Sequence, residues 1–147
     1  MKFIQKVKIK IEKCGRINQE SKIGKPQEAS RIAYEFIDYS DREILGVMCL
    51  NTKNNVINIS MVSMGSLNTS IAHPREIFKT AMLSNAASII MFHNHPSGHL
   101  TPSKEDRDTS TRIKEVGKLL GIELLDSLII GNDSEDGYFS FKESGII

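Results

Sequence analysis

The sequence lacks tryptophan, has only two cysteines and contains no long apolar run. Cys14 and Cys49 are too few, and too far from any histidine pair, to form a disulfide framework or a zinc ribbon. No apolar stretch approaches the roughly 18 residues that a membrane-spanning helix needs. The basic N-terminus MKFIQKVKIKIEKCG also lacks the apolar core of a signal peptide. We therefore expect a cytoplasmic protein with no membrane partner.

Positive charge is concentrated at the N-terminus. The net charge is +1, but residues 1–25 carry eight lysines or arginines against two glutamates, so the remainder is acidic. Apolar side chains alternate with lysines from Phe3 to Ile11, which predicts a half-buried strand at a sheet edge, followed by a polar linker to Lys25. A basic arm of this kind can contact nucleic-acid phosphates. The alternative, which the general protection of sheet edges favours, is that the lysines prevent edge-to-edge aggregation.

Residues 26–147 alternate between helical and strand patterns. Helices are predicted from Pro26, from Pro74 and from Ser103 to about Leu120, where Gly121 ends the last one. Strands are predicted over 43–50, 56–64, 89–92, 122–130 and 138–141. The length is that of one domain, so we expect a single α/β sandwich with a mixed β-sheet flanked by about three helices. The apolar residues expected to face inward from the helices are Ala29, Ile32, Ala33, Phe36, Ile37, Ile77, Phe78, Ala81, Met82, Ile113, Val116, Leu119 and Leu120.

The stretch SIIMFHNHPSGHLTPSKED, residues 88–106, ends a buried strand in two histidines. Because successive side chains of an extended chain point to opposite faces, His93 and His95 project to one side and Asn94 to the other. A Pro-Ser-Gly turn leads to Ser103, a natural helix N-cap, and Asp106 falls in the first helical turn. Two imidazoles and a carboxylate, with water in the fourth position, suit a catalytic zinc site. Alternatively, Ser103 and Asp106 form a capping box that only starts the helix.

The pattern His93-x-His95, seven residues, Ser103, two residues, Asp106 resembles the zinc signature of the JAMM (MPN-domain) metallopeptidases. The stretches HNHPSG, TPSKED, AHPREIF and LLGIELLDSLIIG resemble the RadC family within that group, historically labelled DNA-repair proteins. The resemblance covers residues 26–147 and implies a JAMM/MPN domain of cytidine-deaminase-like fold, with one Zn²⁺ per chain. Family members often carry an N-terminal helix-hairpin-helix module, which we do not expect in residues 1–25.

Amide hydrolysis also requires a base, and a carboxylate from elsewhere in the fold is expected to supply it. Glu43 is the candidate, since the stretch EILG that it begins resembles the E-x-x-G segment at which JAMM enzymes carry their glutamate. Glu35, Asp38 and Asp41 are competitors, but they lie on a helix or its terminating turn, where charged residues are usually solvated. In the family, the serine that matches Ser103 helps to bind the oxyanion of the tetrahedral intermediate.

Four other polar residues near these motifs have open roles. His99 departs from the acidic or amide residue expected after PSG, and its side chain could compete for metal. Ser127 stands where family members commonly have histidine, while Asp126 could orient a ligand histidine. We expect His73 to be structural rather than a fourth ligand.

The resemblance implies a zinc-dependent metallohydrolase that cleaves a peptide or isopeptide amide with metal-activated water. Its partner would be a protein or peptide substrate. The alternative is a DNA-repair or recombination accessory protein that binds nucleic acid through the basic N-terminus, with a structural or vestigial metal site. A catalytically silent scaffold is disfavoured by the intact ligand set. Pairing of the Val7–Ile11 strand with a second copy, as in a homodimer, stays open.

Overall fold

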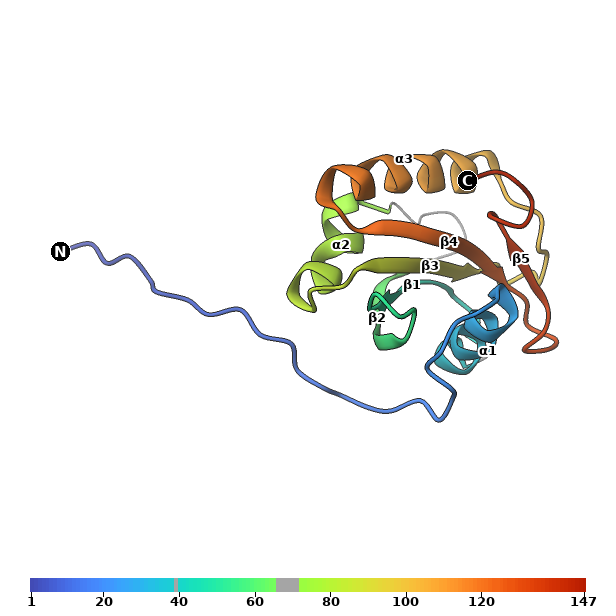
Figure 1. Cartoon of the computed structure of the whole chain (residues 1–147), viewed down its shortest axis with the longest axis horizontal. Coiled ribbons are helices and arrows are strands. Elements are labelled where there is room, and N and C mark those ends of the chain that lie inside the picture. Colours follow the sequence, from blue (N-terminus) through green and yellow to red (C-terminus); the bar gives the residue numbers. More distant parts are fainter. Residues whose placement is uncertain (39, 66–71) are drawn as a thin grey trace.

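A computed structural model describes residues 1–38, 40–65 and 72–147 of the chain. Figure 1 shows one curved sheet with α1 on one face and α2 and α3 on the other. The elements in chain order are α1 (Pro26–Ile37), β1 (Glu43–Leu50), β2 (Val56–Gly65), α2 (Pro74–Leu83), β3 (Ser88–Asn94), α3 (Lys104–Leu120), β4 (Glu123–Ile130) and β5 (Tyr138–Ser140).

The five strands form a mixed sheet in the order β2-β1-β3-β4-β5. β1 pairs antiparallel with β2 and β3, β3 pairs parallel with β4, and β4 pairs antiparallel with β5. The parallel β3–β4 pair is joined by α3, the helical crossover that parallel strands require. The prediction of an α/β domain with one mixed sheet and about three helices is confirmed.

Each face of the sheet has its own hydrophobic core. On one face, β1 and β3 side chains such as Val47 and Met91 pack against Phe78 of α2 and Ile113 of α3. On the other face, neighbouring side chains of the same strands pack against α1. Both cores follow from the strand period of two, which directs alternate residues of a central strand to opposite faces. β3 is buried along its whole length, which explains its continuous apolar sequence.

Local signals place the helix ends where they were predicted. Pro26 and Pro74 occupy the first turns of α1 and α2, where a missing N–H costs nothing. Ser103 is the N-cap of α3 and its side chain accepts a hydrogen bond from the Asp106 N–H. Gly121 ends α3 in the left-handed conformation, with φ of 71°. Both the start and the end of α3 are therefore set by local sequence signals.

Three of the inward-facing residues were predicted wrongly. Leu119 is 88% exposed, and Leu120 and Met82 are also exposed. The buried stripe of α3 instead runs through Ser110, Ile113 and Gly117. A Cβ at Gly117 would lie 2.4 Å from the Ile122 carbonyl oxygen, so the helix backbone packs directly on the chain entering β4. Position 119 lies about 200° around the helix from Gly117, so Leu119 faces away from the sheet.

The strand predicted over Phe3–Ile11 is not formed in the single chain. The segment pairs with no strand in the described part of the chain, and its apolar side chains are exposed. A strand pattern alone is insufficient because an extended segment needs an edge to pair with. Residues 21–23 do contact the sheet, since Lys22 forms a bridge with Asn55. Across the described residues, no helix combines the length and apolarity needed to cross a membrane.

Candidate metal centre

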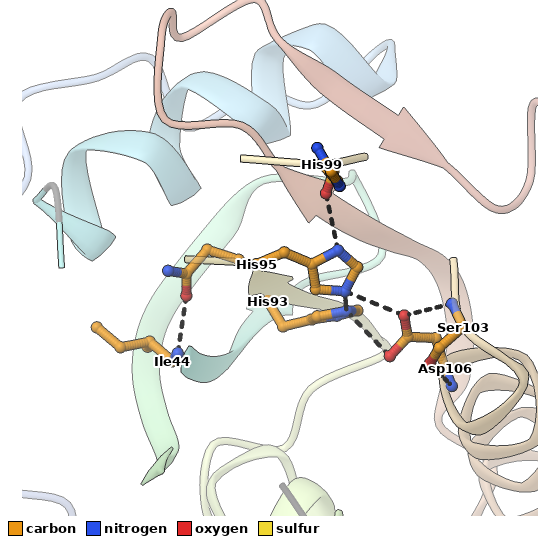
Figure 2. A network of polar contacts seen from close by, with 7 residues as sticks. Ile44, His93, His95, His99, Ser103 and Asp106 are labelled. Carbon is orange, nitrogen blue, oxygen red and sulfur yellow. Dashed lines mark hydrogen bonds and ion pairs between the residues drawn. The ribbon is translucent and has the colours of Figure 1, made fainter. Parts of the chain in front are cut away.

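β3 carries the two histidines to one end of the sheet. His93 is the last residue but one of β3. It pairs with Leu45 of β1 and Ile129 of β4, and it is buried. His95 follows the strand end. Their Nε2 atoms lie 3.2 Å apart, as expected for residues two apart on an extended chain. Figure 2 shows both imidazoles directed towards the carboxylate of Asp106.

The first turn of α3 supplies that carboxylate. Asp106 Oδ1 lies 3.2 Å from His93 Nε2, and Oδ2 lies 3.1 Å from His95 Nε2. The predicted capping box is also present, because the Ser103 N–H donates to Asp106 Oδ2 and the Asp106 N–H donates to Ser103 Oγ. The two interpretations of Asp106 are therefore compatible. Capping holds the carboxylate in place, and its oxygens still face the histidines.

The spacing of the three side chains fits a metal ion. One donor atom from each of His93, His95 and Asp106 can be chosen so that all lie within 4.8 Å of one another. Zinc binds nitrogen and oxygen at roughly 2.0–2.2 Å, so neighbouring donors on a tetrahedral ion lie about 3.3 Å apart. The nitrogen–nitrogen and nitrogen–oxygen distances here are 3.1 to 3.2 Å. The side chains could therefore hold a small cation with little movement.

A backbone carbonyl orients one of the histidines. The carbonyl oxygen of His99 lies 2.8 Å from His95 Nδ1. Since a carbonyl only accepts hydrogen bonds, Nδ1 carries a proton, so that whenever the ring is neutral its lone pair lies on Nε2 and faces the site. Metal-binding histidines commonly receive such support. This contact leaves no signal in the sequence, because any residue type at position 99 would provide the same carbonyl.

Electrostatics couple the aspartate to the histidines. Burial raises the pKa of the Asp106 carboxyl, but hydrogen bonds from His93 and His95 outweigh it and hold the pKa well below its usual range. The hydrogen bond with Asp106 raises the pKa of His95, against an opposing effect of burial, and the charge of Glu43 adds to the increase. The site thus carries a stable negative charge, which favours a cation.

Glu43 begins β1 on the same face of the sheet as the histidines. β1 and β3 are antiparallel with Leu45 opposite His93, so the residue two before Leu45 lies towards His95. The effect of the Glu43 charge on His95 is consistent with this position. Among the competitors, Glu35 instead accepts hydrogen bonds from the Asn18 N–H and the Gln19 side chain.

Asn94, between the two histidines, holds the start of β1. Its side chain points to the opposite face, as predicted, where its oxygen accepts a hydrogen bond of 2.7 Å from the Ile44 N–H. Its nitrogen donates to the Arg42 carbonyl at 3.0 Å. These two backbone groups flank Glu43, so one buried side chain links the position of Glu43 to that of the histidine strand. No residue pattern around Asn94 indicates this role, since its two partners are backbone groups about fifty residues away in the sequence.

The remaining candidates lie outside the histidine–aspartate group. His73 is exposed and is the N-cap residue of α2, and the His99 side chain is exposed as well. Asp126 is buried but accepts hydrogen bonds from the Ser127 N–H, the Ser140 hydroxyl and the Lys142 N–H. Its recorded contacts therefore attach the C-terminal segment to β4 and do not orient a histidine.

These features define an α/β domain with a candidate metal centre at one end of a mixed sheet. The sequence model of the RadC-like JAB domain matches residues 23–146. The chain belongs to the RadC-like JAB domain family.

Bacterial relatives support this assignment. The chain is 54% identical to a UPF0758 protein of Clostridium tetani over 125 residues, which cover 85% of this chain and 54% of that protein. A UPF0758 protein of Clostridium beijerinckii is 49% identical over 131 residues, covering 89% and 56% of the two chains. A UPF0758 protein of Clostridium botulinum is 50% identical over 135 residues, covering 92% and 58%. The chain therefore spans about half the length of these curated relatives.

Proposed function

We propose that the protein is a zinc-dependent hydrolase that cleaves a peptide or isopeptide amide. The observation that carries this proposal is the group of His93, His95 and Asp106, whose donor atoms have the spacing of ligands on one small ion. Imidazole and carboxylate ligands suit zinc, and three protein ligands leave one position open for chemistry. The motif resembles that of the JAMM metallopeptidases, which favours amide hydrolysis over other reactions.

In this proposal the three side chains hold Zn²⁺, with one ion per chain. Zinc in such a site acts as a Lewis acid and lowers the pKa of water. The low pKa of Asp106 keeps its carboxyl ionised as a ligand, and the His99 carbonyl keeps His95 in the tautomer that binds through Nε2. The chain's own residues would therefore supply a negative charge from Asp106 and, from neutral His95, a nitrogen lone pair that faces the ion.

Glu43 is proposed as the general base. It would accept a proton from the attacking water and deliver it to the leaving amine, a role that suits a carboxylate close to the histidines. Its position at the start of β1, on the face shared with His93 and His95, supports this assignment. The two hydrogen bonds from Asn94 to the backbone on either side would hold it there.

Ser103 is proposed to stabilise the oxyanion of the tetrahedral intermediate. Its Oγ already accepts a hydrogen bond from the Asp106 N–H at 3.0 Å. A hydroxyl can donate one hydrogen bond while it accepts others, so capping leaves the hydroxyl proton for the substrate oxygen. Capping and oxyanion binding are therefore compatible at Ser103.

The test is hydrolysis of a peptide library, including isopeptide-linked peptides, by the zinc-loaded full chain, with new termini identified by mass spectrometry. Glu43→Gln should retain its zinc and lose cleavage by about 10²- to 10⁴-fold, since it keeps the shape but not the base. Glu35→Gln is the matched control and should cleave like wild type. Unchanged turnover in Glu43→Gln would exclude Glu43 as the base.

A second substitution separates capping from catalysis at Ser103. Glycine is a tolerable N-cap, so Ser103→Gly should cost only a few tenths of a kcal/mol in stability. Loss of an oxyanion donor should nevertheless lower kcat by about 100-fold. If Ser103→Gly keeps its full rate, the hydroxyl serves only as a cap.

A nucleic-acid accessory function is the second candidate, and the exposed, extended and basic N-terminal segment favours it. Phosphate binding by several lysines should weaken steeply with salt. We expect this function to require salt-sensitive retardation of single- or double-stranded DNA by the full chain. No retardation at low salt would remove it. A cytoplasmic location is also part of the proposal.

A further inference from the structure

β2 is an edge strand with an unusual surface. It is ten residues long, and its sequence VINISMVSMG contains neither charge nor proline. β2 pairs with β1 on one side, whereas on its outer side only Asn55, just before the strand, forms a bridge in the described part of the chain. Natural edge strands are usually protected by charges, prolines, bulges or short length; β2 has register irregularities against β1 at two places but lacks the other three features. It is therefore suited to pair with another strand.

One face of β2 also leaves apolar side chains exposed. The register pairs Ile44 with Met64, Gly46 with Met61 and Met48 with Ile59, so these β2 residues lie on the α1 face of the sheet. α1 packs mainly against β3, β4 and β5, at the other side of the sheet. As a result Met61 is 48% exposed and Met64 is 51% exposed. An added strand with an apolar face would cover them.

The N-terminal segment Phe3–Ile11 has the sequence of such a strand. Val7, Ile9 and Ile11 alternate with Lys6, Lys8 and Lys10. Val7 and Ile9 are each 75% exposed, and Figure 1 shows the segment extending away from the domain. Among the described residues, Phe3–Ile11 thus has the pattern of a strand but pairs with none, and β2 has an outer edge with no strand paired along it.

The chain's own contacts direct this segment away from its own β2. Ser21 accepts a hydrogen bond from the Val56 N–H, and Lys22 pairs antiparallel with Asn55. Continuing that register would place Glu12 opposite Gly65, so the polar residues 12–20 would line β2 and Phe3–Ile11 would lie beyond its end. In addition, the chain at residues 18–19 is attached to Glu35 of α1.

We propose that Phe3–Ile11 of one copy adds a strand to the outer edge of β2 in a second copy. Val7, Ile9 and Ile11 then lie on the face of Ile59, Met61 and Met64, while the lysines project from the opposite face into solvent. Exchange in both directions gives a closed two-fold dimer, the commonest symmetry of homo-oligomers. This inference does not depend on the proposed hydrolase activity.

The first experiment measures mass by light scattering over a range of concentrations of the full chain. Wild type is expected at twice the chain mass. Ile9→Pro fixes φ at about −65°, away from the value of a strand, and should weaken the dimer by about 10-fold or more, whereas Lys2→Pro, just outside the segment, should not. Met61→Lys should weaken it similarly. Met82→Lys is the matched control, because Met82 is 49% exposed but lies on α2.

The second experiment measures amide hydrogen exchange in the same proteins. Protection of residues 3–11 and of the outer β2 amides in the dimer, lost in Ile9→Pro, supports the exchange. Protection at monomeric mass would show docking within one chain and overturn the proposal. Protection that appears only after DNA is added, with monomeric mass, would identify the segment as a nucleic-acid arm and also overturn it. If neither Ile9→Pro nor Met61→Lys weakens the dimer, the dimer uses another surface and the proposal is overturned.

Native cysteines allow a third test of which copies are joined. Cys14 is exposed, whereas Cys49 is buried and burial raises its pKa to about 11, so a thiol reagent at neutral pH labels Cys14 alone. Donor- and acceptor-labelled wild-type chains should show energy transfer after mixing. Energy transfer should be absent when the donor is on Ile9→Pro/Met61→Lys. Equal transfer with that double variant would refute strand exchange.

Discussion

The carbonyl oxygen of His99 lies 2.8 Å from Nδ1 of His95 and accepts a hydrogen bond from the Nδ1–H group. Only the backbone of His99 is used in this contact, while the His99 side chain is exposed. Two histidines four residues apart therefore contribute in different ways. One offers an imidazole nitrogen to the candidate metal, and the other orients that imidazole through a group that every amino acid possesses.

Metal analysis of two alanine variants tests this division. His95→Ala should lower zinc affinity by more than about 100-fold, because it removes one of three ligands rather than an outer support. His99→Ala keeps the carbonyl and should bind one zinc per chain like wild type. Zinc content after dialysis against a weak chelator is the measurement. Equal zinc in His95→Ala and wild type would remove His95 from the site.

Much of this site was predictable because its signals are local. The spacing of His93 and His95 places them on one face of any extended strand, and Ser103 begins a helix through its side chain alone. Asp106 then falls in the first turn. The position of Glu43 beside the histidine strand could not follow from residue patterns, because it depends on which strands pair and in which register. Only the resemblance to a family indicated it.

The errors in the fold have the same origin. Leu119 continues the three-residue spacing of Ile113 and Val116, yet it is exposed because the buried face of α3 is that of Ile113 and Gly117, whose backbone lies against Ile122. That contact lies between elements and leaves no periodic pattern. Similarly, the alternation of residues 3–11 indicates a strand but carries no information about which edge it pairs with.

Asn94 should control the position of Glu43 without affecting the metal. Asn94→Ala removes two buried hydrogen bonds and leaves the Ile44 N–H and the Arg42 carbonyl without that partner, at a cost of about 1–3 kcal/mol. We expect normal zinc content, faster amide exchange at the start of β1 and about 100-fold slower hydrolysis.

Asn58→Ala is the control for Asn94→Ala. Asn58 lies on β2, away from the histidines, and its side chain donates a hydrogen bond of 2.7 Å to Ser84. Its substitution should lower stability by about 1 kcal/mol and leave hydrolysis unchanged. If both variants lose hydrolysis equally, Asn94 has no specific positioning role.

The effect of zinc on thermal stability should depend on pH. In the metal-free protein, Asp106 has a lowered pKa, so its contribution to stability is present above the unfolded value of about 3.9 and is lost as the pH falls through the folded value. His95 has a raised pKa, so its contribution is present below about 6.5 and is lost as the pH rises through the folded value. Metal-free stability should therefore be greatest between these two limits.

Zinc requires neutral imidazoles, so protons compete with it in the same range. The increase in Tm on adding zinc should be small near pH 5.5 and larger by several degrees near pH 8. At the higher pH His95 has lost the proton that pairs it with Asp106, so the metal can bind without displacing that proton. Scanning calorimetry with and without EDTA provides the measurement. His95→Ala should show little increase at either pH. An equal increase in wild type at both values would contradict the pKa directions.

Substitution of Gly46 tests the packing between β1, which carries Glu43, and β3, which carries His93. A Cβ at Gly46 would lie 2.2 Å from Cζ of Phe92, whose ring is fully buried and in edge contact with Phe36. Because the ring has no room to withdraw, Gly46→Ala should destabilise the protein by about 1–3 kcal/mol in urea unfolding. Gly24→Ala is the control, since its Cβ would lie 3.5 Å from Glu28, an ordinary contact.

A double-mutant cycle of Gly46→Ala and Phe92→Leu tests whether the clash with the Phe92 ring causes the loss of stability. Phe92→Leu alone should destabilise the protein, but Gly46→Ala should cost less in that background because the smaller side chain vacates the space above position 46. A coupling energy of about 1 kcal/mol is expected between residues in such direct contact. Strict additivity would mean that Gly46 is required for a reason other than the Phe92 ring. In the coupled case, the glycine of the EILG stretch is explained by packing, and only its glutamate by chemistry.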